Sequence, residues 1–120
     1  MKTLVLGAST NPRRYSHTAT RRLLDAGHEV VLVGGRAGEL AGQSIHAGPV
    51  ETEGVDTVTL YVGPARQPAY YDYLLGEVKP RRLIFNPGTE NPELMRLARE
   101  AGVEVEVACT LVMLATGQYA

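Results

Sequence analysis

Short apolar runs alternate with amphipathic stretches along the whole chain. Five stretches are predicted to be strands: Lys2–Leu6, His28–Val33, Asp56–Val62, Arg82–Phe85 and Val103–Val107. Asp56–Val62 is continuous enough to be buried on both faces of a parallel sheet. Turn residues follow the first three runs directly, as in Gly7, Gly34–Gly35 and Gly63–Pro64. These turn residues predict that each of the three strands ends at a tight loop.

Most of the segments between the predicted strands have the pattern of a helix. Four helices are predicted: from about Ser16 as N-cap to Gly27, from Gln67 to Val78, from Pro92 to Ala101 after the N-cap Asn91, and from Cys109 to Thr116. The interval after the second strand has no clear period. We expect a loop with one or two helical turns at Arg36–Gly42 and irregular structure at Ile45–Glu53.

Alternating strands and helices predict parallel pairing with right-handed crossovers. The expected fold is one α/β domain over residues 1–120, a three-layer, Rossmann-like, doubly wound sheet of five parallel strands. In such sheets ligands bind beyond the carboxyl ends of the strands. The loops on that edge are predicted to be Gly7–Ser16, Gly34–Gly42, Gly63–Gln67, Asn86–Asn91 and Ala108–Thr110.

Composition narrows the class of protein. The 120 residues are 44% apolar with a net charge of −1, which fits a folded domain and disfavours a broad nucleic-acid or anionic-membrane surface. The apolar runs are far shorter than a bilayer span, so we expect a cytoplasmic protein with no membrane partner. One cysteine excludes an intrachain disulfide, and it has no metal-ligand spacing with the three histidines, so no metal is expected.

The loop after the first strand carries the strongest candidate site. A strand that ends at Gly7 and leads to a helix N-terminus directs free N–H groups at an anion. Gly7 permits a close approach of the backbone, the hydroxyls of Ser9, Thr10 and Ser16 can donate, and Arg13 and Arg14 can bind phosphate oxygens. The loop matches neither the Gly-x-Gly-x-x-Gly pattern nor a P-loop. Residue types alone leave open a plain loop with two solvated arginines.

The segment after the second strand bears on which nucleotide would fit. A dinucleotide site for NAD usually has an acidic residue here, whereas an arginine accommodates a ribose phosphate. This chain has Gly34, Gly35 and then Arg36. The pattern disfavours NAD and favours NADP or the 3′-phosphorylated ADP of coenzyme A (CoA). A surface arginine in a flexible loop is the alternative.

The remaining edge loops offer little support for catalysis. In Asn86-Pro87-Gly88 and the following Thr89, the Asn86 amide and the Thr89 hydroxyl could face the site, although Asn-Pro-Gly is also ordinary turn chemistry. No second carboxylate is placed near the loop to form a general acid and base pair. Cys109 has no histidine base nearby in the sequence. No catalytic residue is therefore predicted.

The last predicted helix is apolar on almost all sides. Its Leu111, Val112, Met113 and Leu114 must be covered by the sheet or by a second subunit. A homodimer therefore stays open as one interpretation.

Four segments together resemble a known family. These are Val5–Ser16, Gly27–Val33, Val55–Thr59 and Ala101–Val105, of which the first matches Gly-Ala-Ser-x-x-Pro-x-Arg-x-Ser in residue type and spacing. The chain resembles the stand-alone CoA-binding domain family, a Rossmann-like module also found in succinyl-CoA synthetase and ADP-forming acyl-CoA synthetases. It departs from the family pattern at Gly34-Gly35, where many members have Asn-Pro, and at Asn86, where many have Gln.

The resemblance implies a binding mode. The first loop would hold the pyrophosphate through Gly7, Ala8, Ser9, Asn11, Pro12, Arg13 and Ser16. Val33 and Gly34 would contact the nucleotide, and Gly63, Asn86 and Gly88 would complete the site. Together with the residue-based candidates, the predicted cofactor-binding set is Gly7, Ala8, Ser9, Thr10, Asn11, Pro12, Arg13, Arg14, Tyr15, Ser16, Val33, Gly34, Gly35, Arg36, Gly63, Asn86, Pro87 and Gly88.

Three functions follow as hypotheses. The first is a small cytoplasmic protein that binds CoA or acyl-CoA without catalysis of its own. The second is a small NADP-dependent reductase, whose proton donor would have to be Tyr15, His17 or Cys109, or a nucleotide sensor. The third is a structural homodimer with a vestigial site.

Overall fold

β1 (Lys2–Leu6) lies inside a seven-stranded sheet in the computed structural model, which describes residues 1–120. The other strands are β2 (Glu29–Gly34), β3 (Gly38–Leu40), β4 (Gln43–Ala47), β5 (Val55–Leu60), β6 (Arg82–Phe85) and β7 (Glu104–Val107). Their order is β3-β4-β2-β1-β5-β6-β7, and every neighbouring pair is parallel except β3 and β4. Without β3, this is the strand order of a doubly wound dinucleotide-binding sheet.

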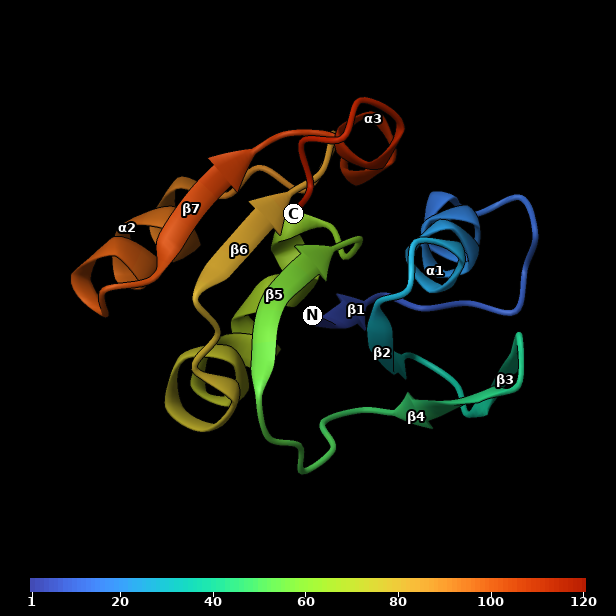
Figure 1. Cartoon of the computed structure of the whole chain (residues 1–120). Helices are drawn as coiled ribbons and strands as arrows, with labels where there is room; N and C mark the ends of the chain where they lie inside the picture. Colours follow the sequence, from blue (N-terminus) through green and yellow to red (C-terminus); the bar gives the residue numbers. More distant parts are fainter.

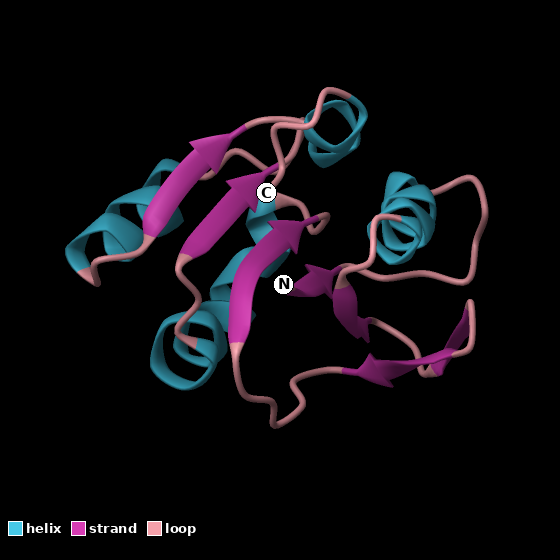
Figure 2. Cartoon of the chain, in the orientation of Figure 1, coloured by secondary structure: helices cyan, strands magenta, loops and turns pink.

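The sheet is the middle of three layers (Figures 1 and 2). On one face, α1 (Tyr15–Asp25) and α3 (Thr110–Ala115) cover a core that includes Val5, Leu23 and Met113. The opposite face is covered by a 3-10 helix, η1 (Pro64–Tyr70), a π-helix, η2 (Tyr73–Val78), and α2 (Pro92–Glu100). Leu4, Leu6 and Phe85 of the sheet pack there against Leu74 and Leu94. Both core clusters are built from apolar positions that alternate along the strands.

Helices on both faces confirm the expected Rossmann-like, single-domain α/β fold, but the prediction of five strands is wrong. The two further strands, β3 and β4, form an antiparallel hairpin where a loop and irregular structure were expected. Ala41 and Gly42 make its turn with φ of +51° and +79°, the backbone that tight hairpins require. Each strand buries a single large apolar residue, Leu40 or Ile45, so the apolar signal was too weak to predict them.

The helix predicted at Gln67–Val78 begins earlier and is not an α-helix throughout. It starts at Pro64 as a 3-10 helix and continues after Tyr71 and Asp72 as a π-helix. Pro68 lies inside the first part and has no N–H to donate to an α-helical bond. The departure from an α-helix therefore follows from Pro68, which the prediction had placed in the first turn of the helix, where a proline is tolerated.

Two helix starts bear on the site. Asn91 is the N-cap of α2 as predicted, and its side chain accepts hydrogen bonds from the N–H groups of Glu93 and Leu94. The N-cap of α1 is Arg14 instead of the predicted Ser16, and no side chain caps this helix. Ser16 is buried in the first turn.

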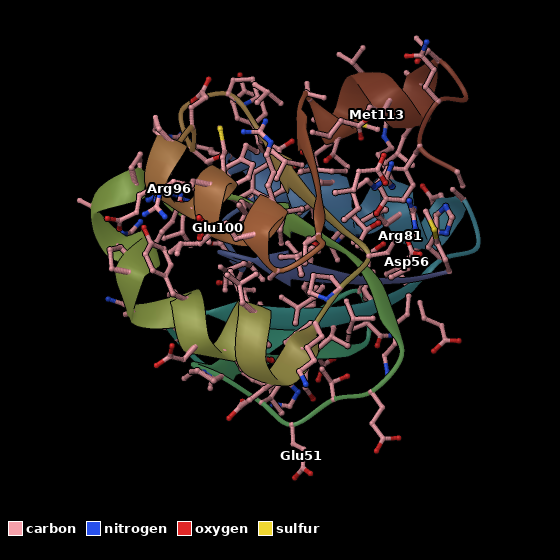
Figure 3. All side chains as sticks on the ribbon, turned by 90° about the vertical axis from the view of Figure 1, so that its left-hand side faces the viewer. Glu51, Asp56, Arg81, Arg96, Glu100 and Met113 are labelled. Atoms are coloured by element: carbon pink, nitrogen blue, oxygen red, sulfur yellow. The ribbon has the colours of Figure 1, made fainter.

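Ion pairs connect β5, β6 and β7 near the amino ends of these strands. Arg81 contacts Asp56 and Glu104, each at 2.8 Å, and Figure 3 shows Arg81 beside Asp56. Arg82 contacts Glu106 at 3.2 Å, and its guanidinium also lies over the ring of Tyr119. No helix of the chain combines the length and apolar character needed to cross a bilayer.

Candidate functional site

A cleft of about 840 Å³ lies at the carboxyl edge of the sheet, where the loops after β1, β2, β5 and β6 meet. The chain leaves β1 and β5 toward opposite sides of the sheet here, which makes this the topological switch point. The lining residues are Gly7, Ala8, Ser9, Thr10, Asn11, Arg14, Tyr15, Ser16, Gly34, Gly35, Arg36, Ala37, Tyr61, Val62, Gly63, Arg66, Tyr70, Pro87, Gly88 and Thr89.

The floor of the cleft begins with a tight turn after β1. Gly7 has a φ of +99°, and a Cβ there would lie 2.8 Å from the carbonyl oxygen of Tyr61. The N–H groups of Gly7 and Ala8 both donate to the carbonyl of Val33, at 2.8 and 3.0 Å. These two amides hold the loop against β2 and are not available to a ligand.

The next part of the loop presents free donors. The Ser9 hydroxyl accepts from the N–H of Asn11, and the Asn11 side chain accepts from the N–H of Arg13, so the loop is shaped by its own side chains. By contrast, the N–H groups of Ser9, Thr10, Tyr15 and Ser16 have no acceptor within the chain. These four donors, together with the uncapped N-terminus of α1, form a concave site for an anion.

The charge of the cleft has one sign. Arg14, Arg36 and Arg66 line it, and none of them is in an ion pair or makes a side-chain hydrogen bond within the protein. No aspartate or glutamate lines the cleft. In a protein with a net charge of −1, this local excess of positive charge favours a ligand with several anionic groups.

The hairpin β3–β4 supports the β2 side of the cleft. A Cβ on Gly34 would lie 2.3 Å from the carbonyl oxygen of Ala8, and one on Gly38 would lie 2.9 Å from the Cγ2 of Thr10. The close packing brings the strand end and the hairpin directly against the β1–α1 loop. Ala37, between them, lines the cleft.

The loops after β5 and β6 form the other side of the cleft. The buried side chain of Gln67 donates to the carbonyl oxygens of Val62 and Thr89, at 2.9 and 2.7 Å. The Thr89 hydroxyl donates to the carbonyl of Asn86 at 2.8 Å and does not point a free donor at the cleft. The two loops are thus bound to each other through side chains.

Tyr61 has a buried hydroxyl next to the cleft. This oxygen finds no hydrogen-bond partner, although the hydroxyls of Thr59 and Thr110, which bond each other at 2.8 Å, lie nearby. Burial raises the pKa of Tyr61 to about 12. A phenol with so high a pKa remains protonated at neutral pH and gives no support to a role as general base.

Comparison with known proteins places the chain in a family. Residues 1–115 match the family model described as CoA binding domain. The chain belongs to this family. No curated protein matches the chain.

Solved structures of other proteins share the fold. A protein described as uncharacterized is 48% identical, with a TM-score of 0.95 over 98% of this chain and 97% of that one. A conserved hypothetical protein from Pyrococcus furiosus is 31% identical, with a TM-score of 0.71 over 88% and 90% of the two chains. A protein from Thermus thermophilus is 24% identical, with a TM-score of 0.85 over 98% and 90%, a likeness in fold.

Most of the residues predicted for this CoA-binding domain meet in the cleft, and four do not. Pro12 and Arg13 belong to the same loop but do not line the cleft, and Val33 contributes its carbonyl to the turn. The Asn86 amide, expected to face the site, is instead fully engaged with protein. It donates to Thr59 and to the Leu60 carbonyl and accepts from the N–H of Thr110.

The cleft also contains residues that were not singled out from the sequence: Ala37, Tyr61, Val62, Arg66 and Tyr70. Arg66 was placed on the ligand edge as part of Gly63–Gln67, and its positive charge was the available signal. Of the three candidate proton donors for a reductase, only Tyr15 lines the cleft, and it is 76% exposed. His17 and Cys109 lie outside it.

Proposed function

We propose that the cleft binds CoA or an acyl-CoA, with the pyrophosphate at the N-terminus of α1. The observation that carries this proposal is the coincidence of four free backbone N–H groups with three unpaired arginines and no carboxylate in one cleft. Membership of the CoA binding domain family supports this choice of nucleotide. A volume of about 840 Å³ lies in the range of small-molecule and cofactor sites.

The residues present fit the parts of this ligand. Ser9, Thr10 and Ser16 would donate to the pyrophosphate through their N–H groups, and Arg14 would bind its charge. Arg36, on the β2 side, would bind the ribose 3′-phosphate. The pantetheine arm would extend over the loops after β5 and β6, past Arg66 and Thr89.

The protein would bind and orient the ligand and carry out no chemistry of its own. CoA supplies a thiol or thioester when bound. No lining residue forms a nucleophile and base pair or a pair of carboxylates, so nothing in the cleft favours a catalytic step on that group.

The proposed pyrophosphate site is tested by substituting two arginines of α1, Arg14 at its N-cap and Arg21 within it, and measuring CoA binding. Arg14→Ala removes a cation from the cleft, whereas Arg21→Ala removes an exposed cation of α1 outside it. Because a hydrogen bond to a charged group contributes about 1.5–3 kcal/mol, we expect Arg14→Ala to raise the Kd for CoA roughly ten- to a hundredfold in calorimetry. Arg21→Ala should leave the Kd within about twofold of wild type. Equal, small effects of the two substitutions would contradict the proposed pyrophosphate site.

A further inference from the structure

Gln67 is a completely buried polar side chain on a helix that lines the cleft. It is 0% exposed, whereas glutamine is mostly found at protein surfaces. Its neighbours Arg66 and Tyr70 on η1 both line the cleft, and Gln67 itself does not. Gln67 therefore faces inward, away from the ligand, at the base of the helix that presents these two residues.

The hydrogen bonds of Gln67 join the two loops that form one side of the cleft. Its Nε2 donates to the carbonyl of Val62 at 2.9 Å and to the carbonyl of Thr89 at 2.7 Å, and both of these residues line the cleft. Val62 belongs to the loop after β5, and Thr89 belongs to the loop after β6. One amide nitrogen thus binds both loops to each other on the side of the cleft.

A second set of bonds fixes the orientation of this amide. Its Oε1 accepts from Nδ2 of Asn91 at 2.9 Å, and the same Nδ2 donates to the Tyr71 hydroxyl at 2.8 Å. Asn91 is in turn held as the N-cap of α2. All three bonds that the Gln67 amide makes are therefore with groups that are themselves fixed, and a fully satisfied buried network of this kind is rigid and specific.

We propose that Gln67 is a positioning residue that makes the cleft select the whole of CoA over its nucleotide half. The inference rests on the proposed function, in which the pantetheine arm lies over the loops that Gln67 joins. Without the amide donors, two buried carbonyls lose their partner, the loops separate, and Arg66 and Tyr70 shift with η1. The β1–α1 loop is held to β2 by the N–H groups of Gly7 and Ala8, and Arg36 follows β2, so neither depends on the Gln67 amide.

The experiment measures two ligands against two variants. Gln67→Glu keeps the shape but turns a carboxylate toward the carbonyls of Val62 and Thr89, and Gln67→Met keeps the length without any charge. The probes are CoA and adenosine 3′,5′-bisphosphate, which has the 3′-phosphate and the first phosphate of the pyrophosphate but lacks the second phosphate and the pantetheine arm. We expect the Kd for CoA to rise about tenfold or more in both variants, and the Kd for the bisphosphate to stay within about twofold.

A stability control separates positioning from a general loss of structure. Thr3→Val removes another buried hydrogen bond, between Thr3 and Tyr119, which lies outside the cleft. It should lower the melting temperature without changing either Kd. This result excludes lower stability as the cause of a weaker Kd.

The outcomes separate this inference from the function on which it rests. If wild-type protein binds both probes and Gln67→Met weakens them equally, or weakens neither, Gln67 has no selective positioning role. If wild-type protein binds neither probe, the proposed function fails and the inference fails with it.

Discussion

Two tyrosine hydroxyls differ sharply in what holds them. The Tyr73 hydroxyl donates to the Val50 carbonyl at 2.6 Å and accepts from the Val50 N–H at 3.3 Å, which anchors the crossover between β4 and β5. The Tyr61 hydroxyl is buried without a partner. A buried polar group without a hydrogen bond destabilises a fold, while a bonded one stabilises it.

The contrast predicts opposite responses to one substitution. Tyr73→Phe should lower the free energy of unfolding by about 1 kcal/mol, the typical net contribution of a hydrogen bond. Tyr61→Phe should leave the free energy unchanged or raise it by up to about 1 kcal/mol, because it removes an unsatisfied group. Urea unfolding of the two variants checks this, and a large loss of stability in Tyr61→Phe would show that its hydroxyl has a partner.

Among the elements, the junction of β1 and β2 depends on glycine at one position and not at the next. A Cβ on Gly34 would lie 2.3 Å from the Ala8 carbonyl oxygen, whereas a Cβ on Gly35 would meet nothing within 4 Å. Both glycines line the cleft. The difference between them is therefore steric.

Gly34→Ala should push the end of β2 away from the β1–α1 loop. We expect both a lower melting temperature and a CoA Kd raised at least about tenfold, since backbone must move to relieve such a contact. Gly35→Ala is the matched steric control and should leave the melting temperature near wild type. Thermal melting and calorimetry of the pair measure the effect, and a tolerated Gly34→Ala would mean that the loop is not held as described.

The elements also show how far the sequence could predict this fold and its site. The parallel strands β1, β2, β5 and β6 were predictable because each is a run of mostly apolar residues. The edge strand β7, which is largely exposed, was predictable from its place after the helix stop at Gly102. The hairpin was not predictable, since Leu40 and Ile45 are its only large buried residues. The 3-10 helix was not predictable either, because Pro68 is tolerated in the first turn of an α-helix as well as inside a 3-10 helix. Loop chemistry predicted the β1–α1 side of the cleft. Arg66 was on a predicted edge loop but was not singled out as a ligand contact, and Tyr70 was missed because it was assigned to the helix after that loop, whereas η1 already begins at Pro64 and brings it to the cleft.

At the scale of the whole molecule, charge pairs at the far edge of the sheet make stability depend on pH. Arg81 donates to both carboxylate oxygens of Asp56, at 2.8 and 3.0 Å, and this holds the pKa of Asp56 below its ordinary value of 3.8 (Figure 3). Because the unfolded chain takes up this proton more readily, the contribution is complete above about pH 4 and is lost as the pH falls through the lowered pKa. Burial and the N-terminal amine also lower the pKa of His28. The folded protein therefore loses stability as the pH falls below 6.5, because the unfolded chain binds this proton more readily.

Arg81→Ala should therefore make acid unfolding less steep below about pH 4. The effect is expected to be below about 1 kcal/mol, because the Arg81 side chain is 53% exposed and solvent screens the pair. Arg96→Ala, which breaks the exposed pair with Glu100 on α2, is the control and should change the acid limb little. Melting temperatures from pH 2 to 7 would measure both, and identical acid limbs in wild type and Arg81→Ala would refute the role of this pair.

At the scale of the whole molecule, we propose that one cationic cleft binds a phosphorylated nucleotide. Its most direct test is calorimetry of wild-type protein with CoA, dephospho-CoA and NAD at one salt concentration. CoA should bind, dephospho-CoA should bind more weakly because Arg36 loses its phosphate, and NAD should bind weakest of the three. Binding of NAD as tight as that of CoA, or no binding of any of the three, would contradict the account.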